Sequence, residues 1–183
     1  MSDLVLSLLK LVHSPGIGPL VTNQLMELFP DLNELFVLKP QELAEQGVPE
    51  KIIQALQNID FQAVETDLKW ASQNQNNIVT LFDEAYPNLF REIKGAPQVL
   101  FCRGDVKVLQ SLQIAVVGAR NPTPQGAKNA FEFAKFIGEN GYTITSGLAL
   151  GIDAKSHQGA LAAKGRTLAV LGSGLAQIYP SSN

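Results

Sequence analysis

Three short apolar runs, each followed by a loop that contains glycine, dominate the second half of the chain. They are QIAVV at 113–117, YTIT at 142–145 and TLAVL at 167–171. Stretches with helical periodicity separate them. An order of strand, helix, strand, helix, strand predicts right-handed crossovers and a parallel sheet. We therefore expect an α/β, Rossmann-like unit, in which the continuous apolar run 113–117 is a strand buried on both faces.

Both helices of this unit have a recognisable start. Thr123, with Pro124 behind it, predicts an N-cap and first helical position, and Ala127, Ala130, Phe131, Ala134 and Ile137 would share one face of that helix. The next predicted helix runs from Asp153, its expected N-cap, to Lys164.

The first part of the chain has a different pattern. Apolar residues recur at helical spacing, and the turn clusters SPGIGP and QGVPEK interrupt them. The polar stretch SQNQNN at 72–77 has the composition of a linker, and two strand-like runs, NIVTLFD and PQVLFCRG, follow it. We predict a small all-helical domain over 1–77 and a Rossmann-like domain over 78–183.

Charge also divides the chain, whose net formal charge is −3. Residues 1–77 hold four basic and ten acidic side chains, whereas residues 78–183 hold ten basic and seven acidic ones. A polyanion would therefore bind the second domain. No apolar run is long enough for a membrane span, no signal peptide is recognisable, and the single Cys102 forbids an internal disulfide. We expect a cytoplasmic protein without a membrane partner.

The candidate site lies where the three predicted strands end, because ligands of parallel sheets bind at that edge. The loops there are 118–120, 146–147 and 172–174. Glycine lets the backbone approach a ligand, helix N-termini favour anions, and the guanidinium of Arg120 suits phosphate. The predicted residues are Gly118, Arg120, Ser146, Gly147, Gly172, Ser173 and Gly174. The alternative is that these glycines only turn the chain.

Two nucleotide fingerprints are missing from this site. After Gly118 no glycine occurs until Gly126, so neither G-x-G-x-x-G nor a P-loop is present. This argues against a standard NAD or ATP site, and it leaves a nucleic-acid backbone or a different nucleotide as the anion. Asp153 and His157 would share a helix face and could form an acid/base or metal pair. No third ligand is nearby, so we favour a cap and a packed histidine, and we expect no metal or cofactor.

The N-terminal hairpin raises a separate question. SPGIGP lies between two helical patterns. Helix-hairpin-helix modules use a G-x-G hairpin of this kind to present backbone N–H groups to a DNA phosphate, and GVPEKIIQAL could be a second, degenerate hairpin. Pro19 and Leu20 stand where a basic residue would help, and the surrounding segment is acidic. We favour a structural or protein-interaction role for this domain and leave DNA contact open.

Four blocks of the second half occur in an order and at a spacing that closely resemble the DNA-processing protein A (DprA/Smf) family of bacteria. They are YPNLFREIKGAPQVLFCRGD, IAVVGARNPTPQG, ITSGLALGIDAKSHQGAL and GRTLAVLGSGLAQIYPSSN. The resemblance covers residues 78–183. More weakly, the first domain resembles the sterile-alpha-motif-like (SAM) or helix-hairpin-helix-like domain of many members.

The resemblance implies an extended Rossmann fold that binds single-stranded DNA in a positively charged pocket, without a nucleotide cofactor and without catalysis. It implies protection of incoming DNA, displacement of single-strand-binding protein and loading of a RecA-type recombinase in natural transformation. The family's V-G-[SA]-R arginine maps onto Arg120, and its basic residue before the last strand maps onto Arg166 or Lys164. Lys155 would add charge.

The chain also departs from the family pattern, because the family's Rossmann domain continues beyond YPSSN at 179–183. We expect an incomplete sheet, with the surfaces for homodimerisation and recombinase binding in the part that is missing. The runner-up function is a Rossmann-like enzyme that processes a nucleotide with Asp153 and His157. A protein-interaction scaffold led by the helical domain is the third.

Overall fold

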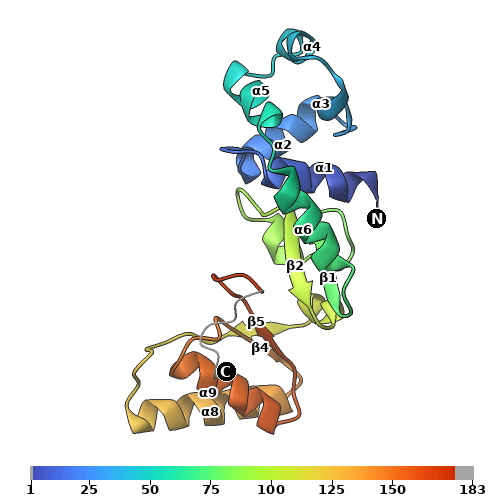
Figure 1. Cartoon of the computed structure of the whole chain (residues 1–183). Helices are drawn as coiled ribbons and strands as arrows, with labels where there is room; N and C mark the ends of the chain where they lie inside the picture. The colour runs from blue at the N-terminus through green and yellow to red at the C-terminus, as the bar shows by residue number, and fades with distance from the viewer. Residues whose placement is uncertain (1, 176–183) are drawn as a thin grey trace. The chain divides into compact units, whose positions relative to one another are not determined.

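The computed structural model describes residues 2–175, which form two compact units. Unit 1 is Met1–Gly104 and unit 2 is Asp105–Asn183. Helices dominate unit 1, and unit 2 holds a parallel sheet with helices, so the predicted α/β fold is confirmed (Figure 1). The block YPSSN at 179–183 lies outside the described residues. No helix among the described residues is long and apolar enough to cross a membrane.

Unit 1 begins with helices that pack around one apolar core. Leu8, Leu9 and Leu11 of the first helix are fully buried, and leucine, isoleucine or valine side chains of the five helices that follow pack against them. Asp60 caps the last of these helices, and its side chain accepts a hydrogen bond from the N–H of Ala63 (2.9 Å). The helices are α1 (Asp3–Val12), α2 (Pro19–Leu28), α3 (Glu34–Val37), α4 (Pro40–Glu45), α5 (Glu50–Gln57) and α6 (Phe61–Ala71).

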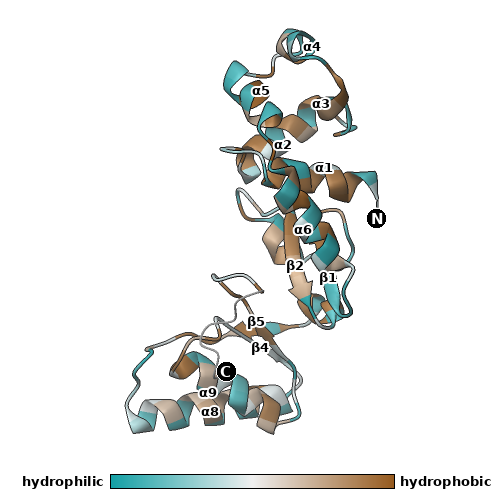
Figure 2. Cartoon of the chain, in the orientation of Figure 1, coloured by the Kyte–Doolittle hydropathy of each residue, from teal (hydrophilic) through white to brown (hydrophobic). Residues whose placement is uncertain are grey.

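A β-hairpin completes unit 1. Its antiparallel strands are β1 (Asn76–Thr80) and β2 (Val99–Arg103), with α7 (Asn88–Arg91) in the connection. β2 is apolar along most of its length, whereas α4 is largely hydrophilic (Figure 2). On the hairpin, Phe101 meets the ring of Trp70 from α6 edge-on, with centroids 5.6 Å apart. The two predicted strands are therefore confirmed, and they pack with the helices.

The linker predicted at 72–77 is wrong. Asn76 already belongs to β1, is buried, and donates from its side-chain amide to the carbonyl of Trp70 (2.8 Å). Gln75 has a φ of +66°, so the polar residues make a tight turn between α6 and β1. Because of this packing, the compact units divide after Gly104, later than the predicted boundary at 77/78.

Unit 2 is built on three parallel strands in the order β3-β4-β5. Ile114 pairs with Ile144, and Thr145 pairs with Leu168, so each strand lies beside the one that follows it in sequence. The predicted strand–helix alternation is confirmed. The elements are the 3-10 helix η1 (Val106–Gln110), β3 (Gln113–Ala115), α8 (Pro124–Glu139), β4 (Thr143–Ser146), α9 (Ile152–Ala162) and β5 (Thr167–Ala169).

Helices α8 and α9 lie side by side on the same face of this sheet (Figure 1). The fully buried side chains between helices and sheet include Ala134 and Ile144. The prediction that 113–117 is buried on both faces is wrong, since Val117 is 77% exposed. Two crossovers of the same hand between successive neighbours place both helices on one face. Both α-helices of the described part of unit 2 therefore lie on one side of the sheet.

Candidate nucleic-acid interface

The loops that follow β3, β4 and β5 meet at one edge of the sheet, as the sequence predicts. The N–H of Ile152 donates to the carbonyl of Ala119 (3.1 Å), which joins the second loop to the first. The N–H of Val170, the first residue after β5, donates to the carbonyl of Ser146, the last residue of β4 (2.9 Å), so the second and third loops leave the sheet side by side. The carboxyl ends of three parallel strands thus present one continuous loop surface.

Arg120 stands on this surface. Arg120 is exposed, and its guanidinium makes no hydrogen bond or ion pair with any described residue. Lys155, on the second turn of α9, is also exposed, but its ammonium donates to Oε1 of Gln158 (2.9 Å). Among the predicted cations at this edge, Arg120 is therefore the one without a partner among the described residues, and its guanidinium suits a phosphate.

The glycines at this edge fall into two groups. A Cβ at Gly118 would lie 2.6 Å from Cγ1 of Ile152, and a Cβ at Gly151, whose φ is +83°, would lie 2.2 Å from the carbonyl oxygen of Ala119. These two glycines let the first two loops pack against each other. No described residue lies within 4 Å of a Cβ added at Gly172 or Gly174, so among the described residues the third loop is the one in which glycine leaves room for a ligand.

Ser146 and Gly147 were expected to face the ligand, and the structure uses their polar groups internally. Ser146 is 3% exposed, and its hydroxyl donates to the carbonyl of Val116 (2.6 Å). The N–H of Gly147 donates to Oδ2 of Asp153 (3.1 Å). Neither group is open to a phosphate in this structure. Contact of any of these residues with DNA stays a prediction.

Arg166 and Lys164 lie at the opposite edge of the sheet. Arg166 directly precedes β5, and its guanidinium donates to the carbonyl of Gly141, in the turn that precedes β4 (3.2 Å). Lys164 is in the turn between α9 and β5. A residue before a parallel strand and a residue after it are separated by the length of that strand. The structure therefore does not bring these two cations together with Arg120.

Capping follows the prediction for one helix and differs for the other. The hydroxyl of Thr123 accepts from the N–H of Gly126 (3.1 Å), which confirms it as the N-cap of α8, with Pro124 next. The predicted cap Asp153 is wrong, because α9 begins at Ile152 and its N-cap is Gly151. The carboxylate of Asp153 turns to the loop before the helix instead.

His157 is buried, as expected for a packed histidine, and its hydrogen bonding is defined. The hydroxyl of Thr167 donates to the carbonyl of Ile144 (3.0 Å), so Nδ1 of His157 donates to that hydroxyl (2.6 Å). Nε2 is then an acceptor, and it has no partner among the described residues. Burial lowers the pKa of His157 and the Asp153 carboxylate opposes this shift, so the imidazole is neutral at pH 7.

The alternative acid/base role for this pair gains no support from the geometry. Asp153 and His157 are each 6% exposed, beneath the loops and against the sheet, and each is already engaged by another group. A general acid or base must reach the proton that it transfers. Among the described residues no group of three or more histidine, cysteine, aspartate or glutamate side chains could hold a metal ion.

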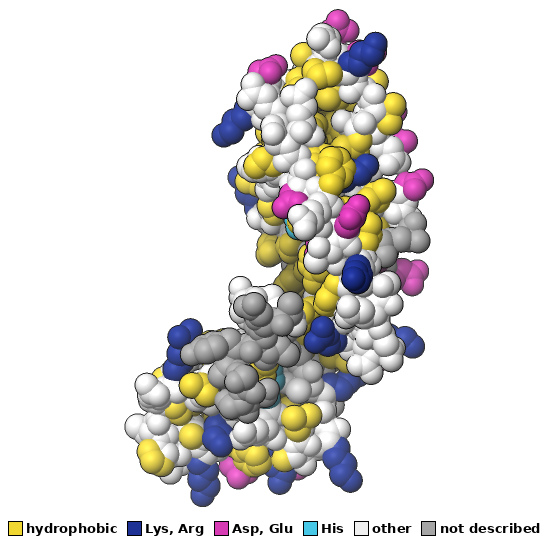
Figure 3. Space-filling model, in the orientation of Figure 1, with side chains coloured by type: hydrophobic (Ala, Val, Ile, Leu, Met, Phe, Trp, Pro, Cys, Tyr) yellow, Lys and Arg dark blue, Asp and Glu magenta, His cyan; other side chains and the backbone are white. Residues whose placement is uncertain are grey.

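The charge of the two units differs in the predicted direction. Unit 1 holds seven basic and thirteen acidic side chains, and unit 2 holds seven basic and four acidic ones. Acidic side chains are prominent over unit 1, whereas Lys and Arg predominate on the visible face of unit 2 (Figure 3). Long-range electrostatics therefore favour unit 2 as the unit that meets a polyanion.

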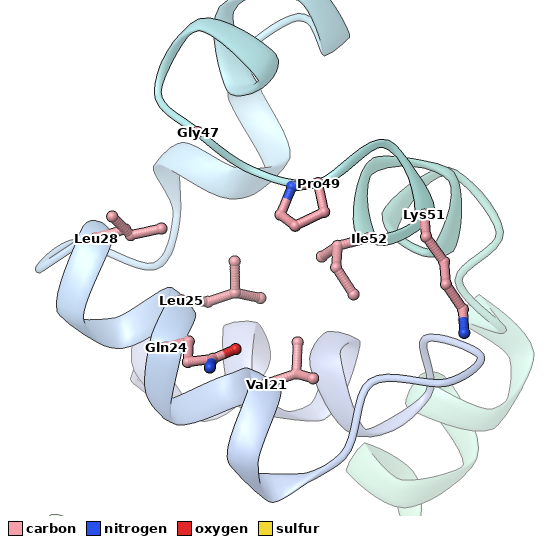
Figure 4. A pocket seen from close by; sticks show the side chains of 8 residues that line it. All are labelled: Val21, Gln24, Leu25, Leu28, Gly47, Pro49, Lys51 and Ile52. Carbon is pink, nitrogen blue, oxygen red and sulfur yellow. The ribbon is translucent and has the colours of Figure 1, made fainter.

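Hollows also occur among the described residues of unit 1, and two of them bear on the prediction for its hairpin. One, of about 450 Å³, lies between α2 and the start of α5; Leu25 and Ile52 line its apolar centre, and Lys51 stands at its rim (Figure 4). The other, of about 440 Å³, lies beside the predicted N-terminal hairpin, and Asp60 is among its lining residues. Nearby, Nε2 of His13 contacts Oδ2 of Asp67 (2.6 Å), a pairing that the sequence did not reveal because the two residues are far apart in the chain. The acidic side chains at and near the second hollow do not favour the binding of a phosphate.

The fold and the converging loops define a Rossmann-like α/β module with an edge suited to an anion. The family model for DNA recombination-mediator protein A matches residues 77–183. The chain belongs to this family. The match starts one residue from the predicted start of the second domain, whose boundaries stay a prediction.

Relatives with similar sequence and structure extend the comparison. Protein Smf of Synechocystis is 35% identical over 178 residues, which cover 92% of this chain and 44% of the relative. The X-ray structure of DNA processing protein A from Streptococcus pneumoniae superposes with a TM-score of 0.78 at 29% identity, over 100% of this chain and 62% of that chain. The structure of DNA processing protein A from Helicobacter pylori, described for its unique single-stranded DNA binding mode, superposes with a TM-score of 0.51 at 34% identity. The superposition covers 57% of this chain and 47% of that chain. This chain thus spans less than two thirds of each relative.

Proposed function

We propose that this chain binds single-stranded DNA through its phosphates, at the edge of unit 2 where the loops after β3, β4 and β5 converge. The observation that carries the proposal is the exposed guanidinium of Arg120, which no described residue engages. Gly172, Ser173 and Gly174 form the open part of the same surface. Phosphate contacts of this kind are largely independent of base sequence.

The wider role follows from the family. We propose that the full-length protein protects incoming DNA, displaces single-strand-binding protein and helps to load a RecA-type recombinase in the cytoplasm, as a homodimer and without a cofactor or catalysis. The Helicobacter pylori relative, described for its single-stranded DNA binding mode, supports the DNA-binding part of this role. The sequence lacks both common nucleotide fingerprints, which supports the part of the proposal that has no nucleotide cofactor.

Salt-dependent binding of labelled oligo-dT tests the proposed site. Affinity should fall steeply as salt rises, and a mixed-sequence oligonucleotide should bind about as well as oligo-dT. Arg120→Ala should weaken binding about tenfold and reduce the slope of log K against log salt by about 0.7, the value for one phosphate on a single strand.

Arg166→Ala is the matched control, since it removes the same side chain from the opposite edge of the sheet. We expect it to weaken binding less than Arg120→Ala does. Equal losses from the two variants would show that total charge, and not the loop surface, determines binding. Unchanged binding by Arg120→Ala would remove Arg120 from the interface.

A further inference from the structure

The carboxylate of Asp153 occupies an unusual place for an acidic group in a DNA-binding unit. It is buried beneath the loop that follows β4, and its Oδ2 accepts hydrogen bonds from the N–H groups of Gly147 (3.1 Å) and Ala149 (3.4 Å). No described cation forms an ion pair with it. A buried carboxylate is stable only when donors satisfy it, so these two N–H groups hold the charge in place.

The loop that Asp153 holds is in turn packed against the loop that carries Arg120. The N–H of Ile152 donates to the carbonyl of Ala119 (3.1 Å). Gly151 lies so close to this loop that a Cβ there would be 2.2 Å from the carbonyl oxygen of Ala119 and 2.5 Å from that of Arg120. A short series of contacts thus runs from the Asp153 carboxylate through residues 147–151 to the backbone of Arg120.

We propose that Asp153 is a positioning residue for single-stranded DNA: it fixes the 147–151 loop and, through it, the backbone from which Arg120 reaches a phosphate. This inference rests on the proposed function. The carboxylate itself does not meet DNA, because it is buried and would repel a phosphate. Its contribution is preorganisation, since a guanidinium held on a fixed backbone loses less freedom when it binds.

Simple helix capping does not account for Asp153. A cap satisfies the free N–H groups of its own helix, whereas this carboxylate accepts from Gly147 and Ala149, which both precede α9. Burial against apolar packing does not account for it either, since an isosteric apolar group would avoid the cost of burying a charge. The two loop N–H groups are the feature that a carboxylate satisfies more strongly here than a neutral acceptor would.

Asp153→Asn tests the role, with Asp105→Asn as its control. Each variant removes one negative charge from unit 2, and each replaced carboxylate accepts backbone hydrogen bonds; Oδ1 of Asp105 accepts from Lys107 N–H (3.0 Å). Added positive charge alone should strengthen oligo-dT binding slightly in both. We expect Asp153→Asn instead to weaken binding about tenfold, because the amide oxygen of asparagine accepts the loop N–H groups without the strength that the charge adds, and Asp105→Asn to stay within about twofold of the unchanged chain.

Gly147→Ala is a second variant that leaves the charge unchanged. A Cβ at Gly147 would lie 3.0 Å from Oδ2 of Asp153, and the φ of Gly147 is outside the left-handed region, so alanine fits the backbone and displaces the carboxylate. We expect weaker oligo-dT binding, by a smaller factor than for Asp153→Asn. This variant keeps the proposal testable if Asp153→Asn fails to fold, which circular dichroism would show.

The decisive readout is the coupling between Asp153 and Arg120 in a double-mutant cycle. If Asp153 acts through Arg120, Asp153→Asn should weaken binding much less in the Arg120→Ala background than in the original chain. If Asp153→Asn weakens oligo-dT binding by the same factor in both backgrounds, Asp153 has only a structural role. The same conclusion holds if Asp153→Asn changes binding no more than Asp105→Asn does. If Arg120→Ala alone leaves binding unchanged, the proposed site fails first, and that outcome is distinct from failure of the positioning role.

Discussion

The two units bury their side chains in different ways. In unit 1, large aliphatic residues from all six helices α1–α6 pack into one core, with Leu8, Leu9 and Leu11 fully buried. In the described part of unit 2 the buried apolar cluster is small, and two of its three members are alanines, Ala134 and Ala160. Unit 1 is thus stabilised mainly by apolar burial, whereas unit 2 depends on close backbone approach that fixes its loops.

The close approach in unit 2 involves its glycines directly. A Cβ at Gly159 of α9 would lie 2.2 Å from the carbonyl oxygen of Phe131 in α8. At the sheet edge, Gly151 lies equally close to the carbonyl oxygen of Ala119, and Gly118 lies close to the side chain of Ile152. Unit 1 has no comparable crowding at Gly16, Gly18 or Gly47, which meet nothing within 4 Å. The comparison predicts that the two units respond differently to the same kinds of substitution.

Core truncation should have the largest effect. Leu9→Ala and Ile144→Ala each remove a fully buried side chain, and each should lower the free energy of unfolding of its own unit by about 2–5 kcal/mol. Because fewer large side chains remain in the described core of unit 2, Ile144→Ala should unfold that unit at a lower denaturant concentration. Residue-resolved amide hydrogen exchange at increasing denaturant concentration measures the unfolding of each unit. Leu112→Ala, at a side chain 73% exposed, is the control. Equal denaturant midpoints of unfolding for the two core variants would contradict the predicted difference between the units.

Glycine replacement should have the next largest effect. Gly151 and Gly47 have φ values of +83° and +86°, so alanine strains the backbone at both. Only at Gly151 does the Cβ also collide with a carbonyl oxygen. We expect Gly151→Ala to destabilise its unit by about 3 kcal/mol or more, and Gly47→Ala by about 1 kcal/mol. Thermal unfolding measures both. A Gly47→Ala loss as large as that at Gly151 would show that backbone strain alone dominates.

Removing a helix cap should lower the free energy of unfolding by about the same amount in the two units. Thr123 caps α8 and Asp60 caps α6, each by accepting from an N–H three residues later. Thr123→Ala and Asp60→Ala should each lower the free energy of unfolding by about 1 kcal/mol, because each leaves one helical N–H without its partner. Chemical denaturation of each variant measures the loss. Thr123→Ser retains the hydroxyl and should recover most of the stability.

The smallest expected effect is a pH dependence in unit 2. The pKa of His157 lies below its ordinary value of 6.5, chiefly because burial disfavours the charged ring. Below pH 6.5 the unfolded chain binds a proton that the folded unit does not, so the free energy of unfolding falls as the pH falls below 6.5, and this contribution is constant above it. Melting temperature against pH, compared with His157→Gln, measures it. A His157→Gln profile with the same acid slope would assign the dependence to other groups.

Much of the fold follows from the sequence, because strand and helix periodicities are local properties. The parallel sheet, the hairpin strands and the cap Thr123 are examples. The turn at 72–77 was mistaken for a linker because its polar residues do not reveal that the amide of Asn76 is buried against α6. An apolar run does not show on which face its helices lie, so the sequence does not predict that α8 and α9 share one face of the sheet.

The candidate site was predictable as a location and not as a set of contacts. Chain order alone places three loops and Arg120 at one edge. The same reasoning could have placed Arg166 at the other edge, since it precedes its strand. The role of Asp153 was not visible, because its partners Gly147 and Ala149 depend on how the loop folds back. Any small acid near a helix start fits the pattern of an N-cap.

The most direct measurement is amide hydrogen exchange of the chain with and without saturating oligo-dT. We expect added protection in residues 117–121 and 170–174 and little change in the α1–α2 hairpin of unit 1. We also expect little change around Gly141 and Arg166 at the opposite edge of the sheet. Protection confined to the hairpin or to that opposite edge, with none in the two loops, would contradict the proposed interface.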